Sequence, residues 1–275
     1  MTARLILSTI ACLLTFTSGI ASALDDPSPA DVLEPPPYDQ FLVIPLRVHI
    51  LTATDLPDVD CHLKDSDIER ILLKANRIWH MAGIHWGLDS IIREPAAKQE
   101  RFREFLKEDR SPSLNSYRML LPEESRKFDG LHVYYLHKFS VNGVWLGGDF
   151  ALVQETAKLR AVPGGIDEPI PRVTSHELGH ALGLPHRQNT TNLLASGTTG
   201  TRLNTREVET ARESAKKKRG AKSVQELKKE ADTTENKSTS AQYRTWLREI
   251  PGAEAEPTKQ LERLKASSVT IPDMS

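Results

Sequence analysis

One segment of the 275-residue chain concentrates side chains that can bind a metal ion and move a proton. Residues 174–186 read TSHELGHALGLPH. His176 and His180 are four positions apart, so on a helix they share one face and can converge on a single ion. Glu177 follows the first histidine, where its carboxylate can lie beside the metal and take a proton from water. The spacing predicts a metal site on a helix with a general base next to it.

A third histidine completes this predicted site. Gly183 can adopt a positive φ, which ends the helix and turns the chain back. That turn brings His186 towards the other two imidazoles. Three histidines leave one coordination position for water or substrate, as in catalytic rather than closed structural zinc sites. We therefore expect one catalytic Zn²⁺ held by His176, His180 and His186.

The elements that must position this segment follow from the spacing of apolar residues. Residues 41–51 predict a strand, in which Pro45 is tolerated mainly at an edge or a bulge. Apolar positions three and four apart predict a helix from Asp65 or Ser66 to Gly83, followed by a strand over 84–92 that pairs in parallel with the first. Further strands are predicted over 131–139 and 150–154, and helices over 96–108, over 168–184 and from Asn204. The order of elements predicts an α+β fold with an α/β-like upper part.

The first 40 residues read as export and linker sequence. Arg4 precedes an apolar run, Leu5 to Ile20, that ends in Ala21-Ser22-Ala23. This arrangement predicts a secretory signal peptide over residues 1–23, because a membrane span needs about 20 apolar residues. Residues 24–40 carry prolines and acidic residues without lysine or arginine, which predicts an extended linker. We expect a secreted, periplasmic or extracellular protein without stable membrane insertion.

Charge composition argues against one class of partner. The chain has 36 Lys+Arg and 37 Asp+Glu, a net charge of −1. Because no overall positive field attracts phosphate backbones, we expect no nucleic-acid partner. Residues 219–275 are strongly charged and predict a partly helical or disordered tail, with a solvated surface favoured over a basic docking patch. The tail residues able to dock on another surface are Tyr243, Trp246, Leu247 and Ile250.

Other histidines and the cysteine of the predicted mature chain are expected to have structural roles. A complete ligand set already exists, so the remaining histidines are predicted to be packed or surface residues rather than ligands. Cys61 is predicted to be a buried or idle thiol rather than a cysteine that blocks the zinc. These histidines are His49, His62, His80, His85, His132 and His137.

The full motif HExxHxxGxxH is matched by His176, Glu177, His180, Gly183 and His186. In this motif the chain resembles the metzincin clan of zinc-dependent endopeptidases, and it looks most like the matrixin-type or reprolysin-like members. The resemblance implies a zincin (metzincin) fold over residues 41–218, with a twisted mixed sheet, an active-site helix and a small C-terminal subdomain. It also implies that an edge strand near Gly147–Gln154 pairs with an extended substrate backbone. The implied function is hydrolysis of peptide bonds by zinc-bound water that Glu177 activates.

Two residues depart from the metzincin pattern. Leu194 stands where these peptidases have a methionine beneath the zinc, and leucine can keep an apolar floor there but not a role of sulfur. Arg187 follows the third histidine and matches none of the familiar subfamily signatures. A second interpretation therefore stays open, in which a catalytically weak or inactive metzincin-fold protein binds zinc and holds peptides in its cleft. Peptides or proteins are the expected partners in either case.

Overall fold

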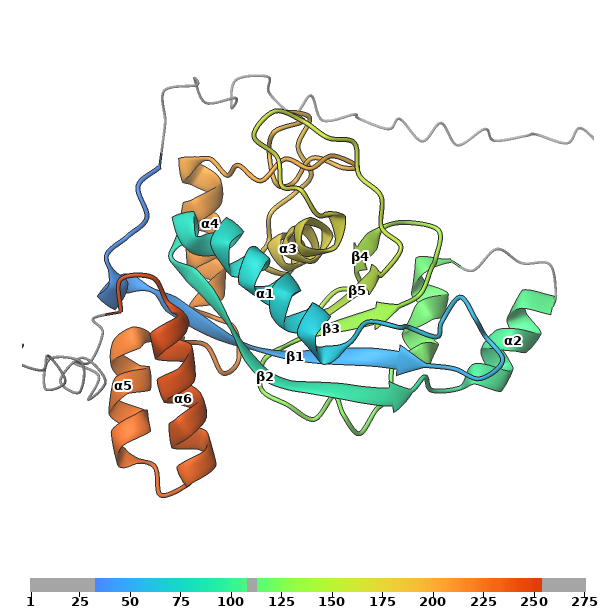
Figure 1. Cartoon of the computed structure of the whole chain (residues 1–275), viewed down its shortest axis with the longest axis horizontal. Coiled ribbons are helices and arrows are strands. Elements are labelled where there is room, and N and C mark those ends of the chain that lie inside the picture. The colour runs from blue at the N-terminus through green and yellow to red at the C-terminus, as the bar shows by residue number, and fades with distance from the viewer. Residues whose placement is uncertain (1–32, 108–112, 254–275) are drawn as a thin grey trace, which may run out of the picture. The chain divides into compact units, whose positions relative to one another are not determined.

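The computed structural model describes residues 33–107 and 113–253 of the chain (Figure 1). The predicted signal peptide, residues 24–32 of the predicted linker and the last 22 residues of the predicted tail lie outside the described residues. Among the described residues, no helix is both long and apolar enough to cross a membrane.

A six-stranded mixed sheet organises the α+β fold. Its main order is β2-β1-β3-β5-β4, and β6 pairs with β1 off this path. The strands β1, β2, β3 and β5 run parallel, whereas β4 is antiparallel to β5 and β6 is antiparallel to β1. The predicted parallel pair of β1 and β2 is confirmed. The strand bounds are Leu42–Thr52 for β1, Ile84–Pro95 for β2, Leu131–Leu136 for β3, Gly143–Trp145 for β4, Phe150–Gln154 for β5 and Lys222–Ser223 for β6.

The edge of the sheet differs from the sequence-based expectation. The strand at residues 150–154 is internal, because β4 pairs with its outer side through Gly143↔Val153 and Trp145↔Ala151. Gly147 and Gly148 have φ values of 85° and 62° and form the tight connection between these two strands. The edge strand is therefore β4, and the prediction that placed it near Gly147–Gln154 is wrong.

Pro45 lies within β1, which is an internal strand between β2 and β3. It separates the stretch of β1 that pairs with β6 (Leu42 and Val43) from the stretch that pairs with β3 (Leu46–Ile50). The pairing of β1 with β2 shifts register directly after Leu46. A proline that cannot donate to a neighbouring strand is thus placed beside a bulge and between two pairing partners, as its chemistry requires.

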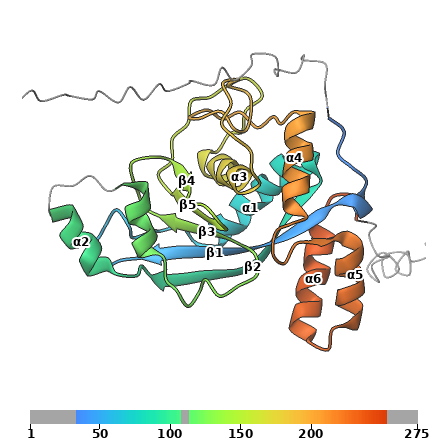
Figure 2. The same cartoon turned by 180° about the vertical axis from the view of Figure 1, so that it is seen from behind.

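Three helices cover one face of the sheet, as the two opposite views show (Figures 1 and 2). They are α1 (Asp65–Trp79), α3 (Pro169–Ala181) and α4 (Thr205–Ala215). Their apolar faces pack on alternate residues of β1, from Leu42 to Ile50, and form the largest core. Asn204 caps α4 and accepts the backbone N–H of Glu207, so the predicted helix start is confirmed. The 3₁₀ segments are Tyr38–Gln40, His80–Ala82 and Leu114–Leu120.

The opposite face of β1 is covered by segments from distant parts of the chain. Near its start, Phe41 and Val43 pack with α5 (Val224–Thr233) and α6 (Lys237–Glu249), which form a helical hairpin. Near its end, Leu51 joins a second core with α2 (Gln99–Lys107) and residues 114–121. Between these, His49 and His132 are buried side by side, and His49 Nε2 is 2.9 Å from His132 Nδ1.

Residues 222–250 of the predicted tail are mostly helical, and α5 and α6 pack on the start of β1 through Trp246, Leu247 and Ile250, which the sequence analysis selected as able to dock. Trp246 is 3% exposed, and its Nε1 donates to the carbonyl of Leu88 at 3.0 Å. A Cβ at Gly87 would come within 2.6 Å of this indole ring, so only a glycine at this position of β2 leaves room for the ring. The charged residues that suggested a tail lie on the outer faces of two amphipathic helices.

Candidate metal and catalytic site

The three predicted metal ligands meet at the end of α3. His176 and His180 lie one turn apart on this helix, and their Nε2 atoms are 3.1 Å from each other. After Ala181 the chain turns at Gly183, whose φ is 84°, and the N–H of Leu184 bonds back to the carbonyl of Gly179. This turn places His186 Nε2 3.1 Å from His180 Nε2. The structure thus brings together the three histidines that the sequence selected.

Backbone carbonyls fix the orientation of two of these rings. His176 Nδ1 is 2.8 Å from the carbonyl oxygen of Leu193, and His180 Nδ1 is 2.7 Å from that of Leu184. Each Nδ1–H therefore donates to a carbonyl, which leaves the Nε2 lone pair directed at the common centre. Burial lowers the pKa of His176 to about 3 and also lowers the pKa of His180. Neutral rings with converging lone pairs are the form in which imidazole binds a metal.

Glu177 lies beside the histidines and is almost completely buried. Its side chain packs against β4, where a Cβ at Gly143 would be 2.8 Å from Glu177 Oε1 and 2.5 Å from a methyl group of Val173. Burial raises the pKa of Glu177 to about 8, although the backbone N–H of Trp145 favours the ionised carboxylate. The edge strand thus holds the carboxylate in place, a contact that the motif alone does not predict.

The turn that carries Leu194 lies beneath the helix. Leu194 is fully buried, and one of its methyl groups would lie 3.2 Å from a Cβ at Gly179, between the two helical histidines. The side chain of Asn192 accepts the backbone N–H of Leu194 at 2.7 Å. Leucine therefore supplies the apolar floor that the sequence predicted for this position.

Arg172, which the sequence analysis did not select, is a buried cation next to the site. It is 1% exposed and donates to the carbonyl oxygens of Gly200 and Ala195 in the segment below the helix. Its Nη1 is 3.1 Å from His176 Nδ1, and the positive charge is a second cause of the low pKa of His176. Arg172 joins the first turn of α3 to the floor of the site.

A buried carboxylate ties the third histidine to the rest of the fold. Glu207, at 1% exposure, accepts from Arg187 Nε at 2.6 Å and from Asn192 Nδ2 at 2.8 Å. It also accepts the backbone N–H of Asn204 at 2.9 Å, at the start of α4. Arg187, which follows His186 and matches none of the familiar signatures, therefore has a structural role as the ion-pair partner of the buried Glu207.

The ligands open into a cleft of about 570 Å³ between α3 and β4. One wall is formed by the edge strand and the residues before it, the other by the helix and residues 196–197. A cleft that combines apolar side chains with convergent polar groups is typical of a ligand site. The lining residues are Leu114, Val141, Asn142, Gly143, Val144, Trp145, Leu159, Arg172, Val173, His176, Glu177, His180, His186, Ser196 and Gly197.

Of the residues that the sequence set aside, Cys61 is buried as predicted, at 3% exposure, and is not among the cleft residues. Burial raises the pKa of its thiol. His49, His85 and His132 are also buried. His62 and His137, however, come together on the carboxylate of Glu155, a cluster that the sequence did not predict.

No protein-family model and no curated protein matches the chain. Solved structures that resemble it include archaemetzincin from Methanopyrus kandleri, at 14% identity and a TM-score of 0.40, over 63% of this chain and 96% of that one. Metalloproteinase-II from Bacteroides fragilis matches at 12% identity and a TM-score of 0.35, over 62% and 53% of the two chains. A chain in a chaperone–substrate complex matches at 14% identity and 0.39, over 65% and 35%. Matches this distant assign no family, so the function is inferred below from the site residues.

Proposed function

We propose that the chain is a zinc-dependent endopeptidase of the metzincin type, similar to the matrixin-type or reprolysin-like members. One observation carries this proposal. Three imidazole Nε2 atoms converge at the wall of a cleft, and a buried carboxylate from the same helix lies beside them. Hydrolysis by a metal-activated water requires this combination of an open ligand set and an adjacent base.

The residues present fit a zinc ion. Two neutral imidazoles have their second ring nitrogens occupied by carbonyl oxygens, which is the usual support for zinc-bound histidine. Three nitrogen ligands leave a coordination position open towards the cleft. When bound, zinc lowers the pKa of a coordinated water towards neutrality and polarises a carbonyl oxygen.

Glu177 is the residue that moves the proton in this proposal. Its carboxylate accepts a proton from the attacking water and then transfers it to the leaving amine. Burial and the packing against Gly143 hold the carboxylate in one position during both transfers. A base that cannot rotate away from the reacting atoms retains the advantage of proximity.

Peptides and proteins are the proposed substrates. The edge strand β4 lines the cleft, and an edge strand has backbone groups free to pair with an added strand. An extended substrate would pair with residues 143–145 and so pass its scissile bond in front of the histidines. Closely spaced apolar residues of the cleft would contact the side chains next to that bond.

Replacement of Glu177 by Gln tests the proposal. The histidines and the packing of this side chain stay nearly unchanged, so the zinc content should equal that of the wild type. Hydrolysis of a mixed peptide library should be chelator-sensitive in the wild type and should fall by about 10²–10⁴-fold in Glu177→Gln, the contribution expected of a general base. The matched control is Glu213→Gln, an exposed glutamate on α4, which should leave both quantities unchanged.

Three results would contradict this reading. Hydrolysis that persists in Glu177→Gln would remove Glu177 as the base. Zinc binding without any hydrolysis by the wild type would favour the peptide-binding protein with an inactive site. Zinc content that is the same in wild type and in a His180→Ala, His186→Ala double variant would show that these histidines do not hold the ion.

We further propose that the protein is exported after cleavage behind Ala23. The support is the Arg4 start, the apolar run and the Ala-Ser-Ala ending of the sequence. Expression of the full chain in a secreting host should yield a mature form whose N-terminal residue is Leu24, measured by mass spectrometry. An intact N-terminus on a cell-retained protein would exclude this proposal.

A further inference from the structure

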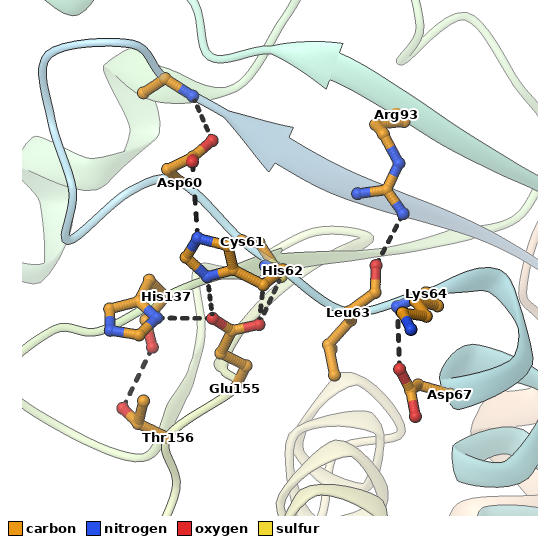
Figure 3. A network of polar contacts seen from close by, with 11 residues as sticks. Asp60, Cys61, His62, Leu63, Lys64, Asp67, Arg93, His137, Glu155 and Thr156 are labelled. Atoms are coloured by element: carbon orange, nitrogen blue, oxygen red, sulfur yellow. Dashed lines mark hydrogen bonds and ion pairs between the residues drawn. The ribbon is translucent and has the colours of Figure 1, made fainter.

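Two strand ends and a loop place three ligand-type side chains together, outside the cleft. His137 directly follows β3, and Glu155 directly follows β5. These neighbouring strands are parallel and in register at Leu136↔Gln154, so the residues after them lie side by side at one edge of the sheet. His62 reaches the same point from the segment between β1 and α1. Figure 3 shows both imidazole rings directed at the carboxylate of Glu155.

The ligand-type atoms of this cluster lie close to one another. His137 Nδ1 is 2.5 Å and His62 Nδ1 is 2.9 Å from the same oxygen, Glu155 Oε1. One ligand atom from each of the three residues lies within 4.8 Å of the other two. The second carboxylate oxygen accepts the backbone N–H of His62 at 2.8 Å and the thiol of Cys61. Because these bonds fix the carboxylate, Oε1 is held towards the two rings.

The charge of the cluster is not balanced by a basic side chain. Within the described residues, the hydrogen bonds and ion pairs of Glu155 involve His62, His137 and Cys61, and none involves a lysine or an arginine. Asp60 adds a second carboxylate, with Oδ2 3.6 Å from His62 Nε2. Two carboxylates around two imidazoles leave a net negative charge unless the rings are protonated or a cation is bound.

The surroundings resemble the support that metal-bound histidines usually have. Asp60 faces the ring nitrogen of His62 that points away from Glu155, and its own position is fixed because Oδ1 accepts the N–H of Ala53 at 2.9 Å. A carboxylate behind a histidine ligand orients the ring and increases its basicity. The side chain of His62 is 67% exposed and that of Glu155 is 10% exposed, so an ion can enter from solvent and meet a fixed anchor.

We propose that His62, His137 and Glu155 bind a second Zn²⁺, separate from the ion at His176, His180 and His186. Two imidazoles and a carboxylate form a ligand set that zinc takes, whereas Ca²⁺ and Mg²⁺ require a shell of oxygens. The ion ties the loop over residues 53–64 to the ends of β3 and β5. That loop leads into α1, which packs on the same core as α3. The role is therefore structural, and it does not depend on the proposed peptidase activity.

Zinc stoichiometry tests this site without any activity assay. Purified protein, saturated with Zn²⁺ and passed through a desalting column, should carry two zinc ions per chain. A His62→Ala, His137→Ala double variant should carry one, as should the His180→Ala, His186→Ala double variant, and the combination of all four should carry none. The matched control is His85→Gln, a buried histidine 3.3 Å from Glu249 that has no third ligand, which should retain both ions.

A second measurement covers variants that fold poorly. In the His180→Ala, His186→Ala background, added Zn²⁺ should raise the temperature of unfolding, because an ion that binds only the folded state stabilises it. Glu155→Gln keeps the size of the side chain and should abolish that rise. The proposal would be overturned if the wild type carried a single zinc ion and the His180→Ala, His186→Ala variant carried none. An unchanged thermal response in Glu155→Gln would overturn it too, since the ion would then bind elsewhere.

Discussion

The contact between Gly143 and Glu177 provides a sharp test of how the edge strand serves the site. In Gly143→Ala the new methyl group would start 2.5 Å from Val173 Cγ1, 2.8 Å from Glu177 Oε1 and 2.9 Å from Glu177 Cγ. Each separation is well inside van der Waals contact, so β4 or the two side chains must move. Overpacking of this kind costs about 1–3 kcal/mol of folding stability. A base displaced by roughly 1 Å costs about 10²-fold in rate.

Three assays on Gly143→Ala separate these effects. Urea unfolding measures the stability loss, and peptide hydrolysis measures the displacement of Glu177. Zinc content should stay at the wild-type value, because the three atoms nearest to the new methyl group belong to Val173 and Glu177 and not to a histidine. In the background of Val173→Ala, the stability cost of Gly143→Ala should fall, since the closest clash is gone, while the loss of rate persists. If Gly143→Ala kept the stability and the hydrolysis rate of the wild type, the reasoning would be refuted, because the methyl group would then fit between β4 and α3 without displacing either side chain.

Three further predictions concern other parts of the fold. Burial lowers the pKa of His49 to about 3 and that of His132 to about 4, so unfolding takes up protons below pH 6.5 and stability falls as the pH falls. Between pH 6 and 4.5, the free energy of unfolding in urea should fall with pH less steeply in His132→Gln than in the wild type, by about 1.4 kcal/mol per pH unit. Equal slopes for the two proteins would exclude a buried neutral ring at His132. Trp246→Ala should lower the free energy of unfolding by about 3–5 kcal/mol in the same assay, because it removes a large side chain from the core under the helical hairpin. A loss below about 1 kcal/mol would mean that the hairpin does not unfold together with the rest of the protein. Leu194→Met should change stability by less than about 1.5 kcal/mol and leave the zinc content unchanged, whereas loss of zinc would show that the floor depends on the shape of leucine.

The ligand set could be predicted from sequence because the contacts that make it are local. His176 and His180 are neighbours on any helix, and a glycine at position 183 determines where the helix ends. The capped start of α4 at Asn204 is local in the same way. The parallel pair of β1 and β2 followed from the length of the connection between them. In each case the sequence signal lay within about one element of the residue concerned.

What the sequence did not predict depends on contacts between distant segments. The edge strand β4 has only three residues, too few for an alternating pattern, and its importance lies in the approach of Gly143 to α3. Trp246 was expected to dock, but its partners, Gly87 and the start of β1, lie far away in the sequence and were not predicted. The cluster at Glu155 arises only once β3 and β5 are parallel neighbours. A polar residue immediately after each of two buried strands was the available signal, and placing the end of the third strand at 139 instead of 136 obscured it.

The position of β1 in the chain sets the order in which the protein can fold. This strand is made early, yet Val43 pairs with Lys222, and Phe41 is covered by helices still further on. During synthesis, the second face of β1 therefore cannot be buried until about 180 further residues have been made. Pairings across such long sequence separations form slowly. A nascent chain that stops short of residue 222 exposes this surface and is prone to aggregate. The helices α5 and α6 thus determine when β1, which lies beneath α3, is covered on its second face.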